Sequence, residues 1–332
     1  MYPVRIEENL RPTRPALRLV KTKDLPREDW LTVRKQGIGS SDAAAAVGLN
    51  PYQSQMELWL IKTGRDSGLP KVDPHDEELP MYWGNILEPI VAAHYTRRSG
   101  NRVRRINAVL QHPEQPWMLA NIDREVIGAS DVQILECKTA GINGAKLWKE
   151  GVPEYVQLQV QHQLAVTGKA TADVAVLLGG QHLEIHRIHR DDRLIARLIQ
   201  LEESFWRYVE TDTPPPADGS ESAEMALRCL YPADIGSTVD FSKDRNLSAK
   251  FADLISVRQS IAEAEKLEAQ LKQSLQQAMG DASKAIFETG TVTWKKAKDS
   301  TGFDLARLLR DQPDLDKQSS LVKPGSRRFL VA

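Results

Sequence analysis

Short runs of apolar residues bounded by Gly, Pro, Asn, Asp or Ser recur along the chain, and this pattern predicts β-strands. Gly128-Ala129-Ser130 separates two of these runs, so we expect the two to form a hairpin. Further hairpins are expected around Gly179-Gly180 and around Gly290. The expected strands lie within residues 102–110, 119–126, 131–140, 173–188, 285–298 and 327–331.

Other segments repeat their apolar residues with helical spacing. Val156, Val160 and Leu164 recur at i, i+4 and i+8, which predicts one buried helix face. This helix is expected over residues 153–167. We expect Pro89 to lie in the first turn of its helix or to kink it, because an interior proline removes a hydrogen bond. Further helices are expected within residues 43–48, 53–64, 83–100, 191–210, 254–280 and 303–313.

The order of these elements predicts an α/β (α+β) fold, with a mixed central β-sheet flanked by helices. Residues 1–28 are rich in proline and are expected to be extended. The segment Pro214–Gly219 is typical of a linker. We therefore expect a core over residues 29–213 and a C-terminal extension over residues 214–332 that contains a helix and a β-hairpin.

The C-terminal extension carries apolar residues at the a and d positions of a heptad repeat. This spacing predicts one long helix that packs on a neighbour or folds back as a hairpin, and Glu268 interrupts the repeat. The apolar positions are Leu254, Val257, Ile261, Ala264, Leu271, Leu275 and Ala278.

Charge and cysteine content narrow the possible classes of protein. The formal net charge is −1, so any contact with nucleic acid must come from local basic patches. Cys137 and Cys229 form no disulfide framework and are too few for a four-cysteine iron–sulfur cluster. The histidines fit no HExxH zinc motif. No apolar run approaches the roughly 20 residues of a membrane span, and the N-terminus has no signal-peptide core, so we expect a cytoplasmic protein.

Asp123, Glu136 and Lys138 are the strongest candidates for chemistry. Side chains alternate along a strand, so Glu136 and Lys138 point to one face and Cys137 points to the other. The hairpin brings Asp123 beside them. Mg²⁺ prefers carboxylate oxygens, and the backbone carbonyl of Cys137 is a candidate third ligand. Lys138 is placed to orient or deprotonate a water, or to stabilise charge in the transition state.

Four segments in the same order resemble one family. They are Arg34–Gly64, Trp83–Pro89, the hairpin with Asp123 and Glu136-Cys137-Lys138, and Val152–Gly168. Together they resemble the YqaJ-type viral recombinase nucleases, which are relatives of the phage lambda exonuclease within the PD-(D/E)xK nuclease superfamily. The resemblance covers roughly residues 30–210 and implies a restriction-endonuclease-like core. It also implies Mg²⁺-dependent digestion of linear duplex DNA from 5′ ends, with Mn²⁺ as a substitute.

The resemblance also implies roles for individual residues. Asp123 and Glu136 match the metal ligands, with the Cys137 carbonyl beside them, and Lys138 matches the catalytic lysine. Glu88 matches a helix-borne acid that completes the site, and Gln159 matches an active-site glutamine.

A separate pair, Arg34 and Ser41, matches the residues that grip the 5′-phosphate of the resected strand. Ser40 lies beside this pair in the sequence. An arginine and a hydroxyl at a helix N-terminus form a sound phosphate cradle.

The chain departs from the family pattern at two places. Arg124 stands where the family usually has glycine after the motif aspartate, which is expected to alter the turn. Val156 stands where a tyrosine is common, with Tyr155 next to it, and Gln157 competes with Gln159 for the glutamine role. Gln159 and Gln163 share another face of this helix, for which the alternative interpretation is a solvated surface.

Three functions remain open from the sequence. The first is a 5′→3′ exonuclease that leaves 3′ single strands for a single-strand annealing protein, acting as a homo-oligomer that the family implies to be a trimer. The second is a structure- or sequence-selective endonuclease on the same core. The third is a non-catalytic DNA-binding or annealing partner. The intact Asp123, Glu136 and Lys138 argue against the third, and the Arg34/Ser41 pair argues for recognition of DNA ends.

Overall fold

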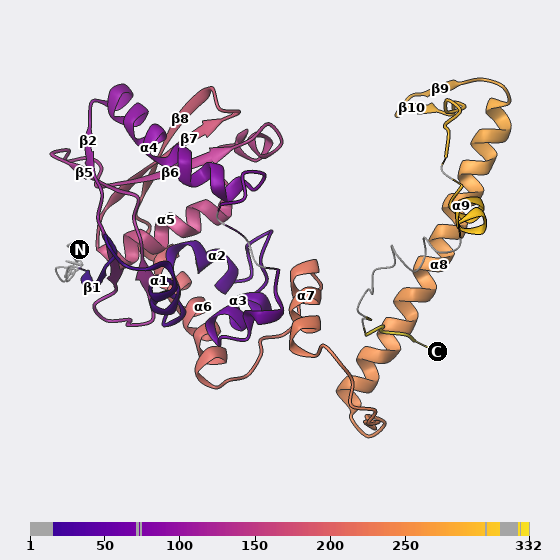
Figure 1. Ribbon diagram of the computed structural model, residues 1–332, viewed down its shortest axis with the longest axis horizontal. Coiled ribbons are helices and arrows are strands. Elements are labelled where there is room, and N and C mark those ends of the chain that lie inside the picture. Colours follow the sequence, from indigo (N-terminus) through magenta and orange to yellow (C-terminus); the bar gives the residue numbers. More distant parts are fainter. Residues whose placement is uncertain are drawn as a thin grey trace, which may run out of the picture. The chain divides into compact units, whose positions relative to one another are not determined.

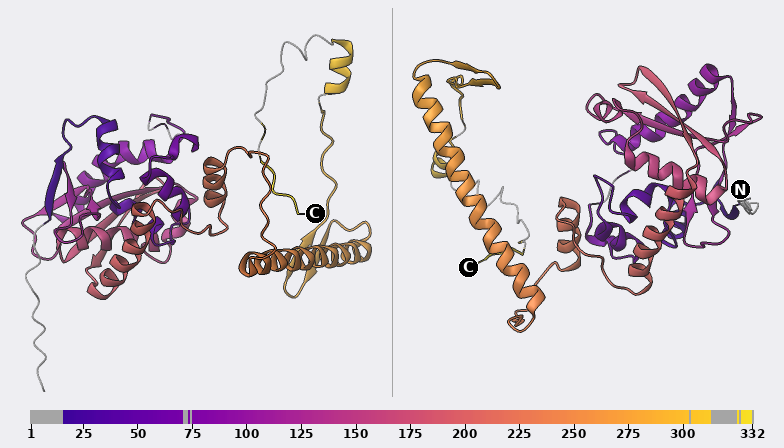
Figure 2. Two further views of the ribbon diagram at one scale, coloured as in Figure 1. Left: turned by 90° about the horizontal axis from the view of Figure 1, so that it is seen from below. Right: turned by 180° about the vertical axis from the view of Figure 1, so that it is seen from behind.

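The computed structural model describes residues 16–70, 73, 75–302, 304–312, 325 and 327–331. The chain divides into two compact units, Met1–Pro232 and Ala233–Ala332. Figures 1 and 2 show the first unit as a central sheet with helices around it, and the second unit as a long helix with short elements after it. The mixed fold predicted from the sequence is confirmed in the first unit.

The central sheet has five strands in the order β2-β5-β6-β7-β8. β6 and β7 are parallel, and the other neighbouring strands are antiparallel. A parallel pair needs a crossover connection, and helix α5 (Glu154–Thr167) supplies it. The strands are β2 (Arg102–Arg104), β5 (Arg124–Ile127), β6 (Ile134–Ala140), β7 (Thr171–Leu178) and β8 (His182–His189).

Helices cover both faces of this sheet. On one face, Tyr95 of α4 (Pro80–Ser99) packs in one buried cluster with Leu135 of β6. On the other face, Leu164 of α5 packs with Ile134 of β6. Helix α6 (Asp192–Glu210) contacts α5 from outside the sheet. Neighbouring residues of β6 therefore face different helices, as a strand requires.

A second sheet has three strands, β1 (Leu17–Lys21), β3 (Ala108–Gln111) and β4 (Leu119–Ala120). The single strands expected over residues 102–110 and 119–126 are therefore wrong. Each of these segments leaves one sheet and enters the other, so each is broken between its two halves. Asp123 lies in the second break, between β4 and β5.

The N-terminal segment also differs from expectation. Residues 17–21 form strand β1 on Ala108–Gln111, which is extended as expected, whereas α1 (Arg27–Lys35) starts before residue 29, so the expectation is wrong at residues 27 and 28. Residues 1–15 lie outside the described residues. Five short helices complete the part of the chain before α5. They are η1 (Ser40–Asp42), α2 (Ala43–Ala46), α3 (Gln55–Lys62), η2 (Asp66–Gly68) and η3 (Gly144–Trp148).

Helix α4 starts at Pro80, earlier than expected, with this proline in its first turn. Pro89 consequently lies in the interior of one helix instead of its first turn. Glu88 sits beside Pro89 in the middle of the helix, so of the two places expected for this proline the first turn is wrong.

The first unit extends past the boundary expected at residue 213. Helix α7 (Glu221–Leu230) packs on α3, and Ala226 is buried in one cluster with Leu60. Ser222 Oγ accepts a hydrogen bond from Ser54 N at 2.8 Å and donates to Glu57 Oε2 at 2.5 Å. Because of these contacts, α7 belongs to the first unit, which ends at Pro232.

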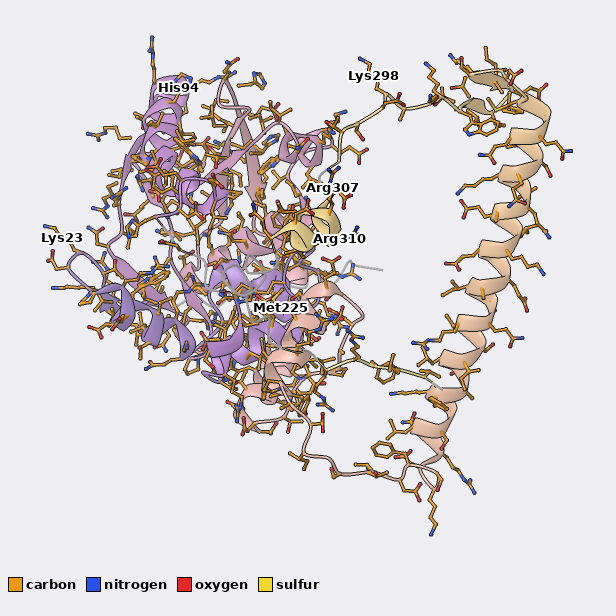
Figure 3. The ribbon with its side chains drawn as sticks, turned by 45° about the vertical axis from the view of Figure 1, so that its right-hand side comes forward. Lys23, His94, Met225, Lys298, Arg307 and Arg310 are labelled. Carbon is orange, nitrogen blue, oxygen red and sulfur yellow. The ribbon has the colours of Figure 1, made fainter. Side chains whose placement is uncertain are left out.

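The second unit begins with the expected long helix, α8 (Arg245–Met279), which ends at Gly280. No residue of α8 is buried, and Figure 3 shows its side chains projecting along the whole length. The expected hairpin is present as β9 (Lys284–Phe287) and β10 (Gly290–Thr293), followed by α9 (Leu305–Asp311). Residues 327–331 form no strand, so that expectation is wrong. Among the helices described, none has the length and apolar character to cross a membrane.

Candidate active site

Asp123 is tied to the central sheet by a backbone hydrogen bond. Its Oδ2 accepts from the N–H of Cys137 at 2.8 Å, which places the carboxylate at the edge of β6. The N–H and C=O groups of one strand residue point to the same side of the strand. The Cys137 carbonyl therefore points to the side on which Asp123 lies.

Glu136 and Lys138 share the face of β6 that α5 covers. The Lys138 Nζ lies 2.8 Å from Glu136 Oε1, and Glu136 is only 3% exposed. The strand pairs along its whole length with β7, so both side chains are held by a rigid sheet. The side chain of Cys137 lies with the apolar cluster on the α4 side, as alternation predicted.

Two glutamines of α5 hold this pair in place. Gln159 Nε2 donates to Glu136 Oε1 at 2.6 Å, while Gln159 Oε1 accepts from Lys138 Nζ at 2.9 Å. Gln163, one helical turn later, donates from Nε2 to Glu136 Oε2 at 2.7 Å and is fully buried. The sequence interpretation of this helix face as solvated is wrong. The i, i+4 spacing of Gln159 and Gln163 was the signal that could have identified Gln163.

The structure distinguishes Gln157 from Gln159, and Tyr155 from Val156, which the sequence left as alternatives. Gln157 is exposed and donates to the carbonyl of Val152, so it does not reach Glu136. Val156 is buried in the core, whereas Tyr155 packs edge-on against Tyr52 with ring centroids 5.8 Å apart. Burial, followed by Tyr52, raises the pKa of Tyr155, and the charge of Lys138 opposes this shift.

Glu88 is paired with arginine. Its Oε1 accepts from Arg124 Nη1 at 2.5 Å and lies 3.4 Å from Arg105 Nη2. Among the residues that the structure describes, no three His, Cys, Asp or Glu side chains converge on one point. The ligands available to a cation are therefore Asp123, Glu136 and the backbone carbonyl of Cys137. Glu88 is not among them, because it is paired with Arg124.

Burial and like charge perturb the acids. Burial, followed by repulsion from Glu136, raises the pKa of Asp123 from 3.8 to about 8, against the stabilising N–H of Cys137. Burial alone would lower the pKa of Lys138, but the attraction of Glu136 outweighs it and the pKa is raised. Lys138 is thus a cation at neutral pH, whereas Asp123 without a metal holds its proton up to a pH of about 8, although Lys138 lowers its pKa.

This set of atoms fits a hard divalent cation. The available donors are all oxygen, which Mg²⁺ and Mn²⁺ prefer, and Mg²⁺ commonly uses one or two carboxylates with waters. A bound divalent charge would relieve the repulsion that raises the pKa of Asp123. The buried Oε1 of Gln163 accepts no hydrogen bond from the described residues, so an acceptor beside Glu136 is still free.

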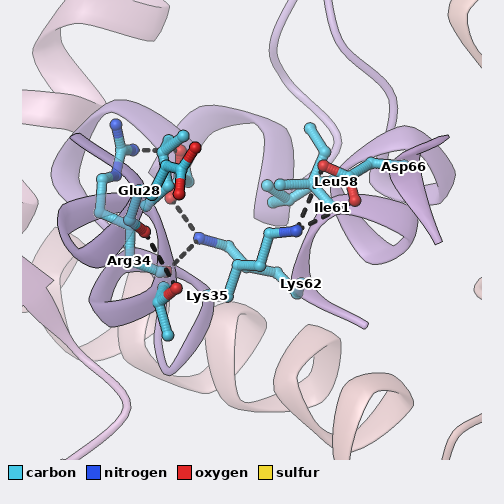
Figure 4. A pocket seen from close by; sticks show the side chains of 10 residues that line it. Glu28, Arg34, Lys35, Leu58, Ile61, Lys62 and Asp66 are labelled. Atoms are coloured by element: carbon cyan, nitrogen blue, oxygen red, sulfur yellow. Dashed lines mark hydrogen bonds and ion pairs between the residues drawn. The ribbon is translucent and has the colours of Figure 1, made fainter. Parts of the chain in front are cut away.

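A second candidate site lies between α1, η1 and α3 (Figure 4). Arg34 Nη2 donates to Ser41 Oγ and to Asp42 Oδ1, each at 2.7 Å, so the expected Arg34–Ser41 pairing is present. The buried Lys62 contacts Asp42 Oδ2 at 2.7 Å. Two cations thus share one carboxylate. Burial would raise the pKa of Asp42, but Arg34 and Lys62 hold it well below its usual range.

A pocket of about 400 Å³ opens beside Arg34. Ser41 is exposed, whereas Ser40 is buried and its Oγ has no partner among the described residues. The pocket is lined by Glu28, Leu31, Thr32, Arg34, Lys35, Asp42, Leu58, Ile61, Lys62 and Asp66.

Comparison with known proteins identifies the family. Residues 29–170 match the model of the YqaJ-like viral recombinase domain. The chain is 35% identical over 305 residues to the uncharacterized protein YqaJ of Bacillus subtilis (strain 168), which covers 90% of this chain and 92% of that protein. The chain belongs to the YqaJ-like viral recombinase family. The resemblance stated from the sequence is therefore confirmed.

Solved structures similar to this YqaJ-like chain include two exonucleases. An alkaline exonuclease from Laribacter hongkongensis is 23% identical, with a TM-score of 0.47 over 56% of this chain and 93% of that chain. A phage-related exonuclease from Haemophilus somnus 129PT is 11% identical, with a TM-score of 0.39 over 55% of this chain and 97% of that chain.

Proposed function

We propose that this YqaJ-like protein is a Mg²⁺-dependent deoxyribonuclease that degrades linear duplex DNA from its 5′ ends. The observation that carries the proposal is the centre at the edge of β6. There Asp123 is bonded to the strand, Glu136 is buried, and Lys138 contacts Glu136 at 2.8 Å. Two carboxylates with an adjacent ammonium suit hydrolysis of a phosphodiester at a metal ion.

Each side chain has a definite task in this reaction. Asp123 and Glu136 would hold the cation, and the two bonds from Gln159 and Gln163 fix the direction of the Glu136 carboxylate. When bound, Mg²⁺ would lower the pKa of a water and offset charge on the scissile phosphate. In the metal-free protein the attraction of Glu136 outweighs burial and raises the pKa of Lys138, so Lys138 is placed to stabilise the charge that develops on the phosphate.

The Arg34 pocket supports recognition of a DNA end. Arg34 and the buried Lys62 both contact Asp42, and Arg34 also donates to the exposed Ser41 hydroxyl, so a guanidinium and a hydroxyl lie together beside the pocket. A terminal 5′-phosphate would replace Asp42 as a partner of the Arg34 fork. Both η1 and α2 pack on α5, the helix that carries Gln159, so the two sites share one rigid support.

The product and partners follow from the same proposal. Removal of the 5′ strand leaves a 3′ single strand, which a single-strand annealing protein would pair with its complement in phage-type recombination. The exposed heptad residues of α8 support self-association, and we propose a homo-oligomer, with the trimer that the family resemblance implies. We place the activity in the cytoplasm of a bacterial host, with Mn²⁺ as a substitute metal.

A labelled linear duplex tests the proposal. With Mg²⁺, we expect early release of the 5′ label as a mononucleotide, at a higher rate when the end carries a 5′-phosphate than a 5′-hydroxyl. Arg34→Ala should abolish this preference. Arg65→Ala is a matched control, because Arg65 also pairs with an aspartate, Asp212, and stacks on a tryptophan, Trp59, yet does not line the pocket.

Two results would contradict the proposal. Early release of the 3′ label would reverse the polarity. Internal fragments at equal rates from phosphorylated and hydroxyl ends would favour an endonuclease and remove the assigned role of Arg34 and Ser41.

A further inference from the structure

Arg124 borders the candidate active site, directly after Asp123, and it is only 6% exposed. One nitrogen, Nη1, donates both to Glu88 Oε1 at 2.5 Å and to the backbone carbonyl of Asp123 at 2.7 Å. A single cationic group therefore joins an oxygen of α4 to an oxygen of the Asp123 peptide. A metal ion joins two oxygen ligands in the same manner.

The sheet separates this contact from Glu136. Arg124 is paired with Leu135 in the register of β5 and β6, and Leu135 packs against α4. Glu136 faces α5 instead, with Lys138 and the glutamines. The Arg124–Glu88 pair thus lies on the α4 side of the sheet, which explains why Glu88 does not converge with the two other carboxylates.

Two of the three acids at this site form ion pairs with basic side chains. Glu136 is paired with Lys138, and Glu88 is paired with Arg124. Asp123 is left with a backbone N–H as its hydrogen-bond donor. Asp123 is therefore the acid that remains for a divalent cation, because Glu136 is paired with Lys138 and Glu88 is paired with Arg124 and Arg105. A second cation between Asp123 and Glu88 would have to leave the guanidinium of Arg124 buried without its partner, which is strongly unfavourable.

We propose that Arg124 fills the position of a second cation, so that this site binds a single divalent ion and Glu88 serves as the partner of Arg124. This inference rests on the metal-dependent function proposed above. The sequence predicted that Glu88 completes the metal site. The inference gives Glu88 a different role, as the partner of Arg124. Arg124 is then a positioning residue that holds Glu88 and the Asp123 peptide in fixed places.

Titration with Mn²⁺ in the absence of DNA tests the inference without measuring activity. Free Mn²⁺ is followed by electron paramagnetic resonance, which counts the ions bound. We expect one ion per wild-type chain, one for Arg124→Lys, which retains a positive charge, and a second, weaker site in Arg124→Gln. The second site should disappear in the double variant Arg124→Gln/Glu88→Gln. Circular dichroism shows whether each variant is folded.

Arg105→Ala is the matched control. Arg105 also contacts Glu88, but at 3.4 Å and with a side chain that is 58% exposed. This variant should still bind one ion. Two ions bound to the wild-type protein would overturn the inference, and so would a single ion bound to folded Arg124→Gln. Neither result would contradict the proposed nuclease function. No bound ion on the wild-type protein would refute the metal-dependent function and the inference with it.

Discussion

Replacing Asp123 by asparagine should stabilise the metal-free protein at neutral and alkaline pH. The raised pKa means that the folded state holds the Asp123 proton more tightly than the unfolded state does. This contribution to stability is complete below the unfolded value of 3.8 and is lost as the pH rises towards about 8. Wild-type protein without metal therefore loses stability over this window, and Asp123→Asn does not.

The size of the effect follows from the shift. Each unit of pKa corresponds to about 1.4 kcal/mol, so the full penalty at pH 7 is about 4 kcal/mol. Asp123 keeps some exposure to solvent, which reduces this value, and loss of the charged bond to the Cys137 N–H costs about 1 kcal/mol. We expect a net gain of about 2 kcal/mol, or roughly 4–8 °C in Tm.

Thermal unfolding in EDTA from pH 5 to pH 9 measures this difference. Asp131→Asn is the control, because Asp131 is exposed and its hydrogen bond to Arg187 lowers its pKa. That variant should show no gain at high pH. If Asp123→Asn is no more stable than the wild-type protein at pH 8, the pKa of Asp123 is not raised in the folded protein. Addition of Mg²⁺ should raise the Tm of the wild-type protein and leave Asp123→Asn unchanged.

Other consequences can be measured separately. Mn²⁺ affinity should rise with pH up to about 8, because binding displaces the Asp123 proton, and calorimetry at several pH values would show it; a flat profile would contradict the raised pKa. Gln163→Leu should lower the free energy of unfolding by about 1–3 kcal/mol in urea titrations, because a buried bond to the catalytic carboxylate is lost, whereas exposed Gln157→Leu should have little effect. A chain that ends at Pro232 should unfold at a higher temperature than one that ends at residue 213, which lacks α7; equal values would restore the earlier boundary.

The sequence predicted the parts of the site that depend on local periodicity. Glu136 and Lys138 share a face because strand side chains alternate, and the buried stripe of Val156, Val160 and Leu164 follows from helical spacing. These relations hold within one element and need no knowledge of its neighbours.

The parts that were missed depend on packing between elements. Gln163 is buried because α5 lies between the sheet and other helices, so more than one face of α5 is covered, which a single apolar stripe did not reveal. Arg124 and Glu88 are 36 positions apart, and their contact requires the α4 helix to cross the sheet. The breaks within the two expected strands arise because the chain changes sheets, and propensity along one strand does not report this.

Digestion of one plasmid in two forms tests the central claim most directly. Linearised and covalently closed circular DNA are incubated with wild-type protein and with Glu136→Gln, each with Mg²⁺ and with EDTA. The account predicts that wild-type protein degrades the linear form only with Mg²⁺, that the circle stays intact, and that Glu136→Gln is inactive. Degradation in EDTA or by Glu136→Gln would contradict the assignment of chemistry to this centre, and cleavage of the circle would contradict an exonuclease.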